Sequence, residues 1–289
     1  MPYRSIFTPD LFAGQTIIVT GGGSGMGRCC AHELASLGAH VVITGRKAEK
    51  LEAVCAEIEE DGGSCSSQAF DIRDEQAVQE AVAALVAEQG QIDGLVNNAG
   101  GQYPSPAEAI SKKGWDAVVA NNLTGGFLVA REVFNQAMNV QKHGAIVNII
   151  ADMWRGMPGM AHSGAARAGM LNLTHTTSVE WARAGVRVNA VAPGWIASSG
   201  LDHYDESFRD QFIAKTRERV PAKRLGEEAE VSAAIVFLLS PAAAYISGSC
   251  IEVDGATSKN AKLWPLPDHS NCKPYEGFHR ARKPKALQS

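Results

Sequence analysis

The sequence contains no uninterrupted apolar stretch of about 18 residues, so nothing in it predicts a membrane-spanning helix. The opening residues, MPYRSIFTPDLF, lack the apolar run of a secretory signal, and the final Ala-Leu-Gln-Ser is not a peroxisomal address of the Ser-Lys-Leu type. The net charge of −4 gives no indication of a nucleic-acid partner. We therefore expect a cytoplasmic protein without a membrane span.

The sequence is also poor in cysteine patterns that carry structure or metal. Cys29 and Cys30 are adjacent within a predicted helix, Cys55 lies in another, and no CxxC pair occurs among the six cysteines. This placement does not form a disulfide framework or a metal-ligand set. We expect reduced thiols and no metal site.

Short apolar runs alternate with helical patterns along the chain. The predicted strands are Thr16–Thr20, His40–Thr44, Ser67–Phe70, Gly94–Asn97, Ala145–Ile150, Val186–Val191 and Cys250–Val253. The predicted helices are Met26–Leu37, Ala48–Asp61, Asp74–Gln89, Trp115–Val140, Ser163–Ala184 and Val231–Leu239. Continuous rather than alternating apolar strands indicate a parallel sheet that is covered on both faces. The fold class is therefore α/β, as a single doubly wound domain with a seven-stranded, mostly parallel sheet.

Two regions stand apart from this rhythm. Residues 195–225 lack a clear strand, and we interpret them as a lid near the substrate. After Gly255 the composition changes to Pro, Lys and His. We therefore divide the chain into a domain at 1–255 and a C-terminal extension at 256–289, which is expected to lie on the surface or to contact another subunit.

A glycine-rich turn, Thr20–Gly27 (TGGGSGMG), follows the first strand and opens the first helix. Glycines at this point permit a tight turn, and the helix N-terminus offers free N–H groups to a pyrophosphate. The alternative is an ordinary glycine-rich turn. The candidate dinucleotide-binding residues here are Gly21, Gly23, Ser24, Gly25 and Met26.

No acidic residue ends the second strand, where a carboxylate would bind the ribose hydroxyls of NAD. The sequence there is Thr44-Gly45-Arg46-Lys47. Arg46 and Lys47 could pair with a 2′-phosphate, which favours NADP(H) over NAD(H) as the cofactor. The alternative is that both are solvated residues at a helix start.

The ends of the later strands supply further candidates, because the carboxyl ends of parallel strands share one edge of the sheet. We expect Asp71 and Ile72 to contact the adenine. The remaining candidate cofactor-binding residues are Asn98, Ala99, Gly100, Pro193, Gly194 and Ile196.

Several of these motifs together resemble the short-chain dehydrogenase/reductase family. They are TGGGSGMG at Thr20–Gly27, NNAG at Asn97–Gly100, Asn122 in NNLTGGF, VNAVAPG at Val188–Gly194 and IEVDG at Ile251–Gly255. The resemblance implies a Rossmann-like fold, an active site at the carboxyl ends of the strands and a homo-oligomer, usually a homotetramer.

Within that family the chain is most similar to the peroxisomal trans-2-enoyl-CoA reductases and 2,4-dienoyl-CoA reductases. The similar segments are Asn97–Ser111, His162–Gly169 (HSGAARAG), Val220–Gly226, Leu238–Gly248 and Pro267–His269.

The family's catalytic Ser, Tyr and Lys are not matched. The corresponding positions hold Ile150 or Ala151, then Ser163 and Arg167, and Asn122 alone is unchanged. A displaced Tyr-x-x-x-Lys a turn further on is absent as well, since that frame holds Leu171 and His175, and the dienoyl reductase position holds Asp152.

The resemblance suggests roles for four residues in catalysis. Arg167 replaces the lysine and holds the nicotinamide ribose, and Ser163, with Asn122 through water, donates to the substrate oxygen. His162 either protonates the substrate or caps the helix. Asp152 is either a base or a surface loop residue, and Trp154 with Met153, Met157 and Met160 either lines an apolar pocket or packs in the core.

The lost tyrosine distinguishes between reactions. Oxidising an alcohol requires a general base, whereas reducing an enoyl thioester places charge on an oxygen that needs positioned donors. The first hypothesis is therefore NADP(H)-dependent reduction of an enoyl-CoA-type double bond, with Arg155, Arg280, Arg282, Lys283 and Lys285 as a basic mouth for the CoA phosphates. A dehydrogenase of a fatty or terpenoid alcohol that uses Tyr103 or Tyr204 is the second, and a non-catalytic dinucleotide-binding protein is the third.

Overall fold

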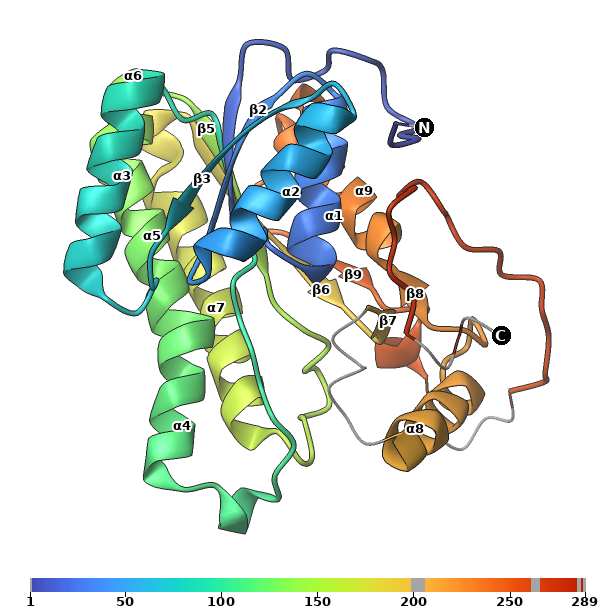
Figure 1. Cartoon of the computed structure of the whole chain (residues 1–289). Coiled ribbons are helices and arrows are strands. Elements are labelled where there is room, and N and C mark those ends of the chain that lie inside the picture. Colours follow the sequence, from blue (N-terminus) through green and yellow to red (C-terminus); the bar gives the residue numbers. More distant parts are fainter. Residues whose placement is uncertain (1, 199–205, 261–265, 285–286, 288–289) are drawn as a thin grey trace.

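A computed structural model describes residues 2–198, 206–260, 266–284 and 287 (Figure 1). A seven-stranded sheet with the order β3-β2-β1-β4-β5-β6-β9 forms its centre, and every neighbouring pair of strands is parallel. The strands are β1 (Thr16–Thr20), β2 (His40–Gly45), β3 (Ser64–Ala69), β4 (Gly94–Asn97), β5 (Gly144–Ile149), β6 (Val186–Pro193) and β9 (Cys250–Val253). The predicted doubly wound α/β fold is confirmed.

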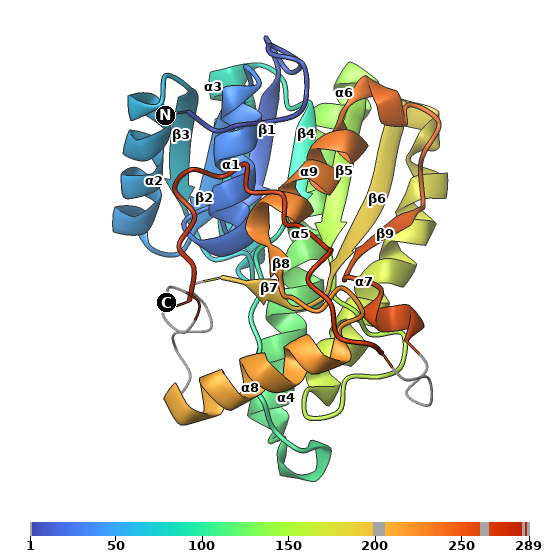
Figure 2. The same ribbon diagram turned by 90° about the vertical axis from the view of Figure 1, so that its right-hand side faces the viewer.

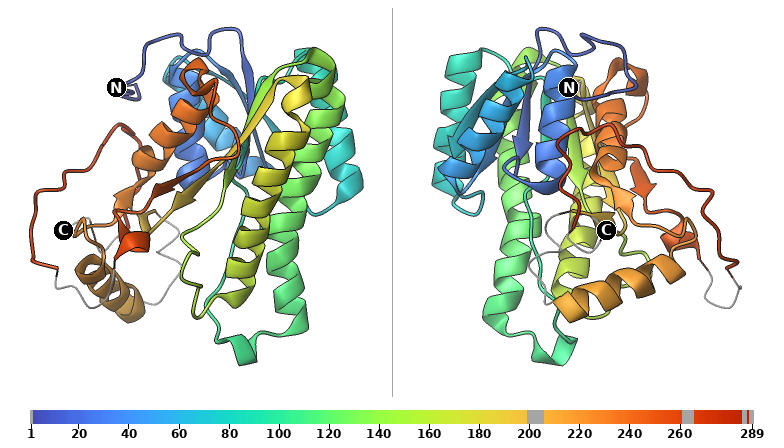
Figure 3. Two further views of the ribbon diagram at one scale, coloured as in Figure 1. Left: turned by 180° about the vertical axis from the view of Figure 1, so that it is seen from behind. Right: turned by 45° about the vertical axis from the view of Figure 1, so that its right-hand side comes forward.

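Helices cover both faces of the sheet (Figures 1 and 2). One face carries α1 (Gly25–Ser36), α2 (Ala48–Glu60) and α9 (Glu228–Leu239). The other carries α3 (Glu75–Gln89), α5 (Gly125–Val133) and α7 (Ala161–Glu180), and Figure 3 shows α5 and α7 side by side. None of the helices in the described part of the chain is long and apolar enough to cross a membrane.

The strands are buried from both sides, which explains their continuous apolar runs. Successive side chains of a strand point to opposite faces. Ile17 and Val19 of β1 therefore pack in the cluster that contains Leu34 of α1, whereas Ile18 between them packs with Val133 of α5. Burial of each such side chain stabilises the fold by about 1.5–3 kcal/mol.

The predicted helix Trp115–Val140 is a longer and less regular segment in the structure. It begins at Lys112 with α4 (Lys112–Val119), passes through α5 and ends with α6 (Asn139–Gln141). Two π-helical stretches, at Ala120–Thr124 and Phe134–Met138, interrupt it. A hydrophobic pattern does not register such stretches, because they insert a residue without breaking the helix.

Residues 195–225, which lack a clear strand in the sequence, contain one strand of two residues in the structure. Ile196–Ala197 forms β7, which pairs in parallel with β8 (Gly226–Glu227), and α8 spans Glu206–Arg219. A two-residue strand is too short to produce an alternating pattern. Residues 199–205 of the expected lid lie outside the described residues.

The C-terminal extension returns to the N-terminal half of the same chain (Figure 2). The Phe278 ring stacks on Tyr3 with ring centroids 5.6 Å apart, and the guanidinium of Arg28 in α1 lies 5.0 Å from the Phe278 centroid. Arg280 forms an ion pair with Asp61 just beyond α2, at 2.9 Å. The extension is therefore a docked part of the described structure.

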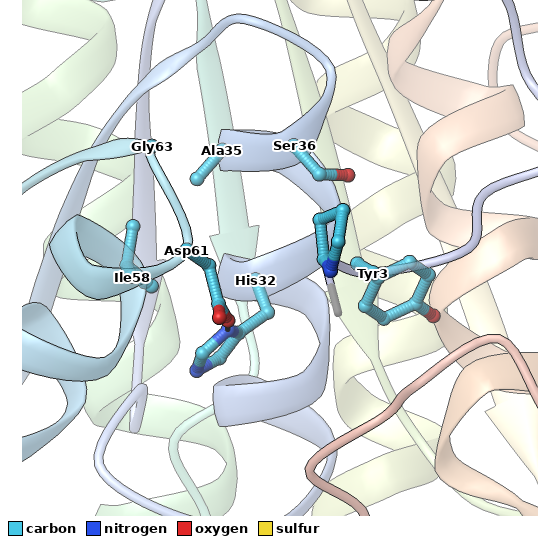
Figure 4. Close-up of a pocket in the computed structure, with 8 residues that line it drawn as sticks. Tyr3, His32, Ala35, Ser36, Ile58, Asp61 and Gly63 are labelled. Carbon is cyan, nitrogen blue, oxygen red and sulfur yellow. Dashed lines mark ion pairs between the residues drawn. The ribbon is translucent and has the colours of Figure 1, made fainter.

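A small pocket lies beside this docked segment, between Tyr3, His32 of α1 and Asp61 (Figure 4). His32 Nδ1 lies 3.4 Å from an Asp61 carboxylate oxygen. The pocket has a volume of ≈ 10 Å³, which admits at most about one water molecule. The pocket is therefore a packing gap beneath the N-terminal residues Pro2 and Tyr3 and not a ligand site.

We predict that Phe278→Ala releases the extension. Phe278 is 5% exposed, and removing a buried aromatic ring costs about 3 kcal/mol. The free energy of unfolding from chemical denaturation should fall by this amount, and limited proteolysis should cut the extension faster. Tyr245→Ala is the matched control, because Tyr245 is fully exposed at 104%. Equal stability of the two variants would contradict the prediction.

Candidate active site

The glycine-rich turn is fixed by hydrogen bonds to the neighbouring strands. The backbone N–H of Gly21 donates to the carbonyl oxygen of Thr44 at 2.8 Å, and Gly21 has φ +69°, a conformation that favours glycine. The Thr20 hydroxyl oxygen accepts from the backbone N–H groups of Asn98 at 3.0 Å and Ala99 at 2.9 Å. The ends of β1, β2 and β4 therefore meet at one point.

The N-terminus of α1 opens directly from this turn. Ser24 is the N-cap, and its side chain forms no capping hydrogen bond within the described chain, so the N–H groups of the first turn stay available. A Cβ on Gly27 would collide with the Asn98 amide and the Gly21 carbonyl group. The helix thus starts close against β4, with Gly23, Gly25 and Met26 around its first turn. These groups fit a pyrophosphate.

The carboxyl end of β2 is basic and exposed. Arg46 and Lys47 are exposed, and neither forms a salt bridge with any residue that the structure describes. Next to them the side-chain oxygens Thr44 Oγ1 and Gln68 Oε1 are buried without a hydrogen-bond partner in the described structure. The Thr44 hydroxyl and the Gln68 carbonyl oxygen can form hydrogen bonds with ribose hydroxyls, and the positive charges of Arg46 and Lys47 suit a phosphate, so this end of β2 fits part of a dinucleotide.

The two adenine candidates lie after β3. The two Asp71 carboxylate oxygens share the N–H of Arg73 Nε, at 2.9 and 3.1 Å, and hydrogen bonding from Arg73 lowers the pKa of Asp71. Ile72 is 6% exposed and packs against the backbone of Gly125. Asp71 is thus a charged, positioned carboxylate, whereas Ile72 is mostly part of the core.

The last cofactor candidates follow β6. Pro193 ends that strand, and its carbonyl oxygen accepts from the N–H of Asp152 at 3.2 Å. The backbone N–H of Gly194 donates to the carbonyl oxygen of Val253 in β9 at 3.0 Å. Ile196 begins β7. The structure therefore places all these residues at the edge of the sheet that holds the glycine-rich turn.

Asn122 lies within the π-helical stretch that follows α4 and is 1% exposed. Its Nδ2 donates to the carbonyl oxygens of Gly101 at 2.7 Å and Val118 at 2.9 Å, and its Oδ1 accepts from the Gly101 N–H at 3.1 Å. Asn122 thus clamps the loop after β4 from both sides. The π-helical turn is what brings its side chain to this loop.

Arg167 of α7 places a cation beneath the same loop. Its Nη1 donates to the carbonyl oxygen of Ile149 at 2.7 Å, while Nε is buried with no partner among the described residues. A Cβ on Gly100 would lie 2.5 Å from Arg167 Nη2 and 2.7 Å from Asn122 Oδ1, so only glycine fits there. Burial lowers the pKa of Arg167 to about 10, which leaves the side chain positively charged at neutral pH.

His162 and Ser163 lie in the first turn of α7, and both side chains are fully buried. His162 Nδ1 accepts from the backbone N–H of Ser163 at 2.9 Å, and its ring meets Tyr103 edge-on with centroids 4.8 Å apart. His162 Nε2 has no partner among the described residues. The histidine therefore caps a backbone group of the first turn.

Gln102 is a site residue that the sequence reasoning missed. The hydroxyl group of Ser163 donates to Gln102 Oε1, although the residues are 61 positions apart in the sequence. Gln102 itself is exposed. The one available signal was its position, two residues after the NNAG motif at the end of β4.

The loop after β5 contains the remaining pocket candidates. Burial and the charge of Asp254 raise the pKa of Asp152. Met153 packs against a small cluster around Ile150 and Met170, while Trp154 is 40% exposed. Met157 and Met160 are half-buried. These residues therefore divide between packing and surface.

A cavity of ≈ 230 Å³ lies further along this edge. Its walls come from β9 and the turn after it, from Trp195 and from the segment around the Arg224–Glu230 ion pair, which measures 2.6 Å. Asp254 lines it as well. The cavity is smaller than most ligand pockets, which measure roughly 300–1,000 Å³.

Three of the residues that we expected to form a basic mouth for the CoA phosphates, Arg280, Arg282 and Lys283, form ion pairs within the described structure. Arg280 is paired with Glu60 and Asp61, and Arg282 lies 3.3 Å from Glu57. Lys283 pairs with Glu276 at 2.7 Å. The two arginines hold the extension on α2 and on Asp61 just after it, whereas Lys283 pairs within the extension and with Glu227 before α9. Arg155 is committed to the Asn260 carbonyl oxygen, and Lys285 and Tyr204 lie outside the described residues.

Comparison with known proteins shows that this chain is similar to several oxidoreductases. The chain is 39% identical over 244 residues, 83% of this chain and 95% of the relative, to a probable 2,4-dienoyl-CoA reductase of Bacillus subtilis. It is 37% identical over 86% of its length to 96% of a gluconate 5-dehydrogenase of Gluconobacter oxydans. A solved citronellol catabolism dehydrogenase of Pseudomonas aeruginosa PAO1 is 63% identical, with TM-score 0.80, 89% of this chain covered and 100% of the other.

The family assignment follows from the extent of the match. Residues 21–257 match the family model described as enoyl-(acyl carrier protein) reductase, which covers more than half of the chain. That range contains the glycine-rich turn, Asn122 and the α7 segment. The chain therefore belongs to the short-chain dehydrogenase/reductase family of oxidoreductases.

Proposed function

We propose that this protein is an NADP(H)-dependent reductase of the carbon–carbon double bond in an enoyl thioester with an apolar acyl chain. The observation that carries the proposal is the pairing of Ser163 and Arg167 in α7. The positively charged side chain of Arg167 lies beside the loop after β4. Four residues earlier in the same helix, Ser163 offers a hydroxyl group that does not ionise near neutral pH.

The chemistry of the two reactions explains why this pairing favours reduction of a double bond. When bound, the reduced nicotinamide supplies a hydride to the β-carbon of the thioester, and a proton then reaches the α-carbon from water. The negative charge develops on the thioester oxygen. Arg167 provides a positive field there, and no residue has to remove a proton. Alcohol oxidation would need a base that Ser163 is unable to supply.

The proposed cofactor preference rests on the carboxyl end of β2. Arg46 and Lys47 offer unpaired cations among the described residues, and no acid stands at Thr44 to Lys47 to repel a 2′-phosphate. Two solved relatives are described with NADP or NADPH, a gluconate 5-dehydrogenase of Beutenbergia cavernae and an actinorhodin polyketide ketoreductase. Both observations support NADP(H).

Some of the relatives support the proposed substrate class, while others are described as gluconate or glucose dehydrogenases. Both the Bacillus subtilis relative and a peroxisomal relative of Danio rerio, 33% identical, are described as 2,4-dienoyl-CoA reductases. The relative that is 63% identical is described by citronellol catabolism, and citronellol is an apolar, methyl-branched alcohol. A branched, apolar enoyl thioester combines both features.

A dehydrogenase of a terpenoid alcohol is the second candidate, because of that same 63% identity to a citronellol catabolism dehydrogenase. It requires a different proton acceptor. Tyr103 is 40% exposed and lies over His162, which makes it the tyrosine to test in the described chain.

We predict that the protein oxidises NADPH in the presence of a medium-chain trans-2-enoyl-CoA, with or without a methyl branch. Arg167→Ala should lower kcat/KM by about 10²–10³, as the loss of one oxyanion-stabilising group does. Arg167→Lys should retain most of the activity, since it keeps the charge. The measurement is the absorbance of NADPH at steady state, with citronellol and NADP⁺ as the parallel assay.

Each outcome separates the candidates. Turnover of citronellol alone, lost in Tyr103→Phe, would replace the reductase proposal with the dehydrogenase. Saturable NADPH binding by fluorescence without turnover of either substrate would favour a non-catalytic dinucleotide-binding protein.

We predict that Arg46→Ala weakens NADPH binding and leaves NADH binding almost unchanged. A hydrogen bond to a charged group contributes about 1.5–3 kcal/mol, which corresponds to a roughly 10- to 100-fold increase in the Kd for NADPH. Fluorescence titration with both cofactors measures it. Arg183→Ala, at an exposed arginine in the turn after the C-terminal end of α7, is the control. A parallel loss for NADH would indicate that Arg46 does not contact a 2′-phosphate.

A further inference from the structure

We propose that the Gln102 carboxamide is the group that binds the substrate oxygen, and that Ser163 is the residue that positions it. This inference rests on the proposed reductase function. It assigns the place of the missing tyrosine to a pair of side chains from two different elements, the loop after β4 and the first turn of α7.

The hydrogen bond between the two side chains fixes the direction of the amide. The Ser163 hydroxyl donates to Gln102 Oε1, so the carbonyl end of the amide points toward α7. Nε2 and its two N–H groups then point away from Ser163. Ser163 is fully buried while Gln102 is exposed, so the group that a substrate can reach is the amide and not the hydroxyl.

The backbone that carries Gln102 is rigid at its start. Gly101 is held by Asn122 through both its N–H and its carbonyl oxygen, at 3.1 and 2.7 Å. Gly100, one residue earlier, leaves no room for a Cβ between Arg167 and Asn122. A donor that projects from such a clamped loop and is oriented by a second hydrogen bond is preorganised, as electrostatic catalysis requires.

The charge environment matches an oxyanion. The positive Arg167 guanidinium lies under Gly100, two residues before Gln102. An amide donates hydrogen bonds but neither takes up nor releases a proton near neutral pH. The Gln102 amide and the Arg167 guanidinium therefore stabilise the charge that develops on a thioester oxygen, and neither is able to deprotonate an alcohol. This gives a physical reason for selectivity toward double-bond reduction.

The test compares Gln102→Glu with Gln102→Ala, Ser163→Ala and Ser163→Thr in the NADPH-dependent reduction of a medium-chain trans-2-enoyl-CoA. Gln102→Glu is the same size and still accepts from Ser163, but it replaces the donor with a carboxylate. We expect kcat at neutral pH to fall about 100-fold or more, in the range seen for loss of an oxyanion donor, with the Kd of NADPH unchanged. Gln102→Ala should fall comparably.

The pH profile distinguishes donation from mere structural support. In Gln102→Glu, activity should return as the pH falls toward the pKa of the carboxyl group, because the protonated acid is again a donor, and Gln102→Ala should show no such recovery. Ser163→Ala should lower kcat about tenfold, Ser163→Thr should restore it, and adding Ser163→Ala to Gln102→Ala should have no further effect. Gln89→Glu, at the C-terminal end of α3, adds the same charge at the opposite edge of the sheet and is the control.

Failure of this inference and failure of the proposed function give different results. If the wild-type protein reduces the enoyl thioester and both Gln102 variants keep its kcat, the role of Gln102 is wrong and the reductase stands. If the wild-type protein turns over only a terpenoid alcohol, the reductase proposal and the amide's role fall together. If it turns over neither substrate, both are overturned.

Discussion

The candidate active-site edge of this protein is organised around the partly buried cation of Arg167. A guanidinium with a buried Nε needs compensation, and the Ile149 carbonyl oxygen at the end of β5 provides it at 2.7 Å. The backbone of Gly100 then packs directly against Nη2, and Asn122 fixes the next residue. The loop after β4 is thereby shaped by a charge on α7, and the position of Gln102 depends on both.

Ser163 places a hydroxyl group that does not ionise near neutral pH in the first turn of α7, next to an otherwise complete set of candidate site features. The cation, the clamped loop and the glycine-rich turn remain. Under the proposed function, this site stabilises a negative oxygen of the substrate, and the proton that the carbon needs comes from water. The reaction types that stay available are those in which the protein supplies charge and position.

The C-terminal extension serves the fold. Its aromatic anchor, Phe278, lies between Tyr3 and α1, and its arginines pair with acids at the end of α2. Since the matched family range ends at residue 257, this docking is an addition of the chain to its Rossmann-like domain. It packs the extension against Tyr3 and α1, on the face of the sheet that carries α1, α2 and α9 (Figure 2).

The sequence by itself determined the sheet, most helices and the place of the glycine-rich turn between β1 and α1. Continuous apolar runs such as those of β1 and β2 require burial on both faces, and a glycine-rich turn between a strand and a helix is a local feature. Tertiary structure decided everything that depends on distant residues. Gln102 meets Ser163, Arg280 meets Asp61, and π-helical turns place Asn122 only in the folded chain. Sequence patterns report local periodicity, whereas these contacts arise where the packing of separate elements brings polar groups together.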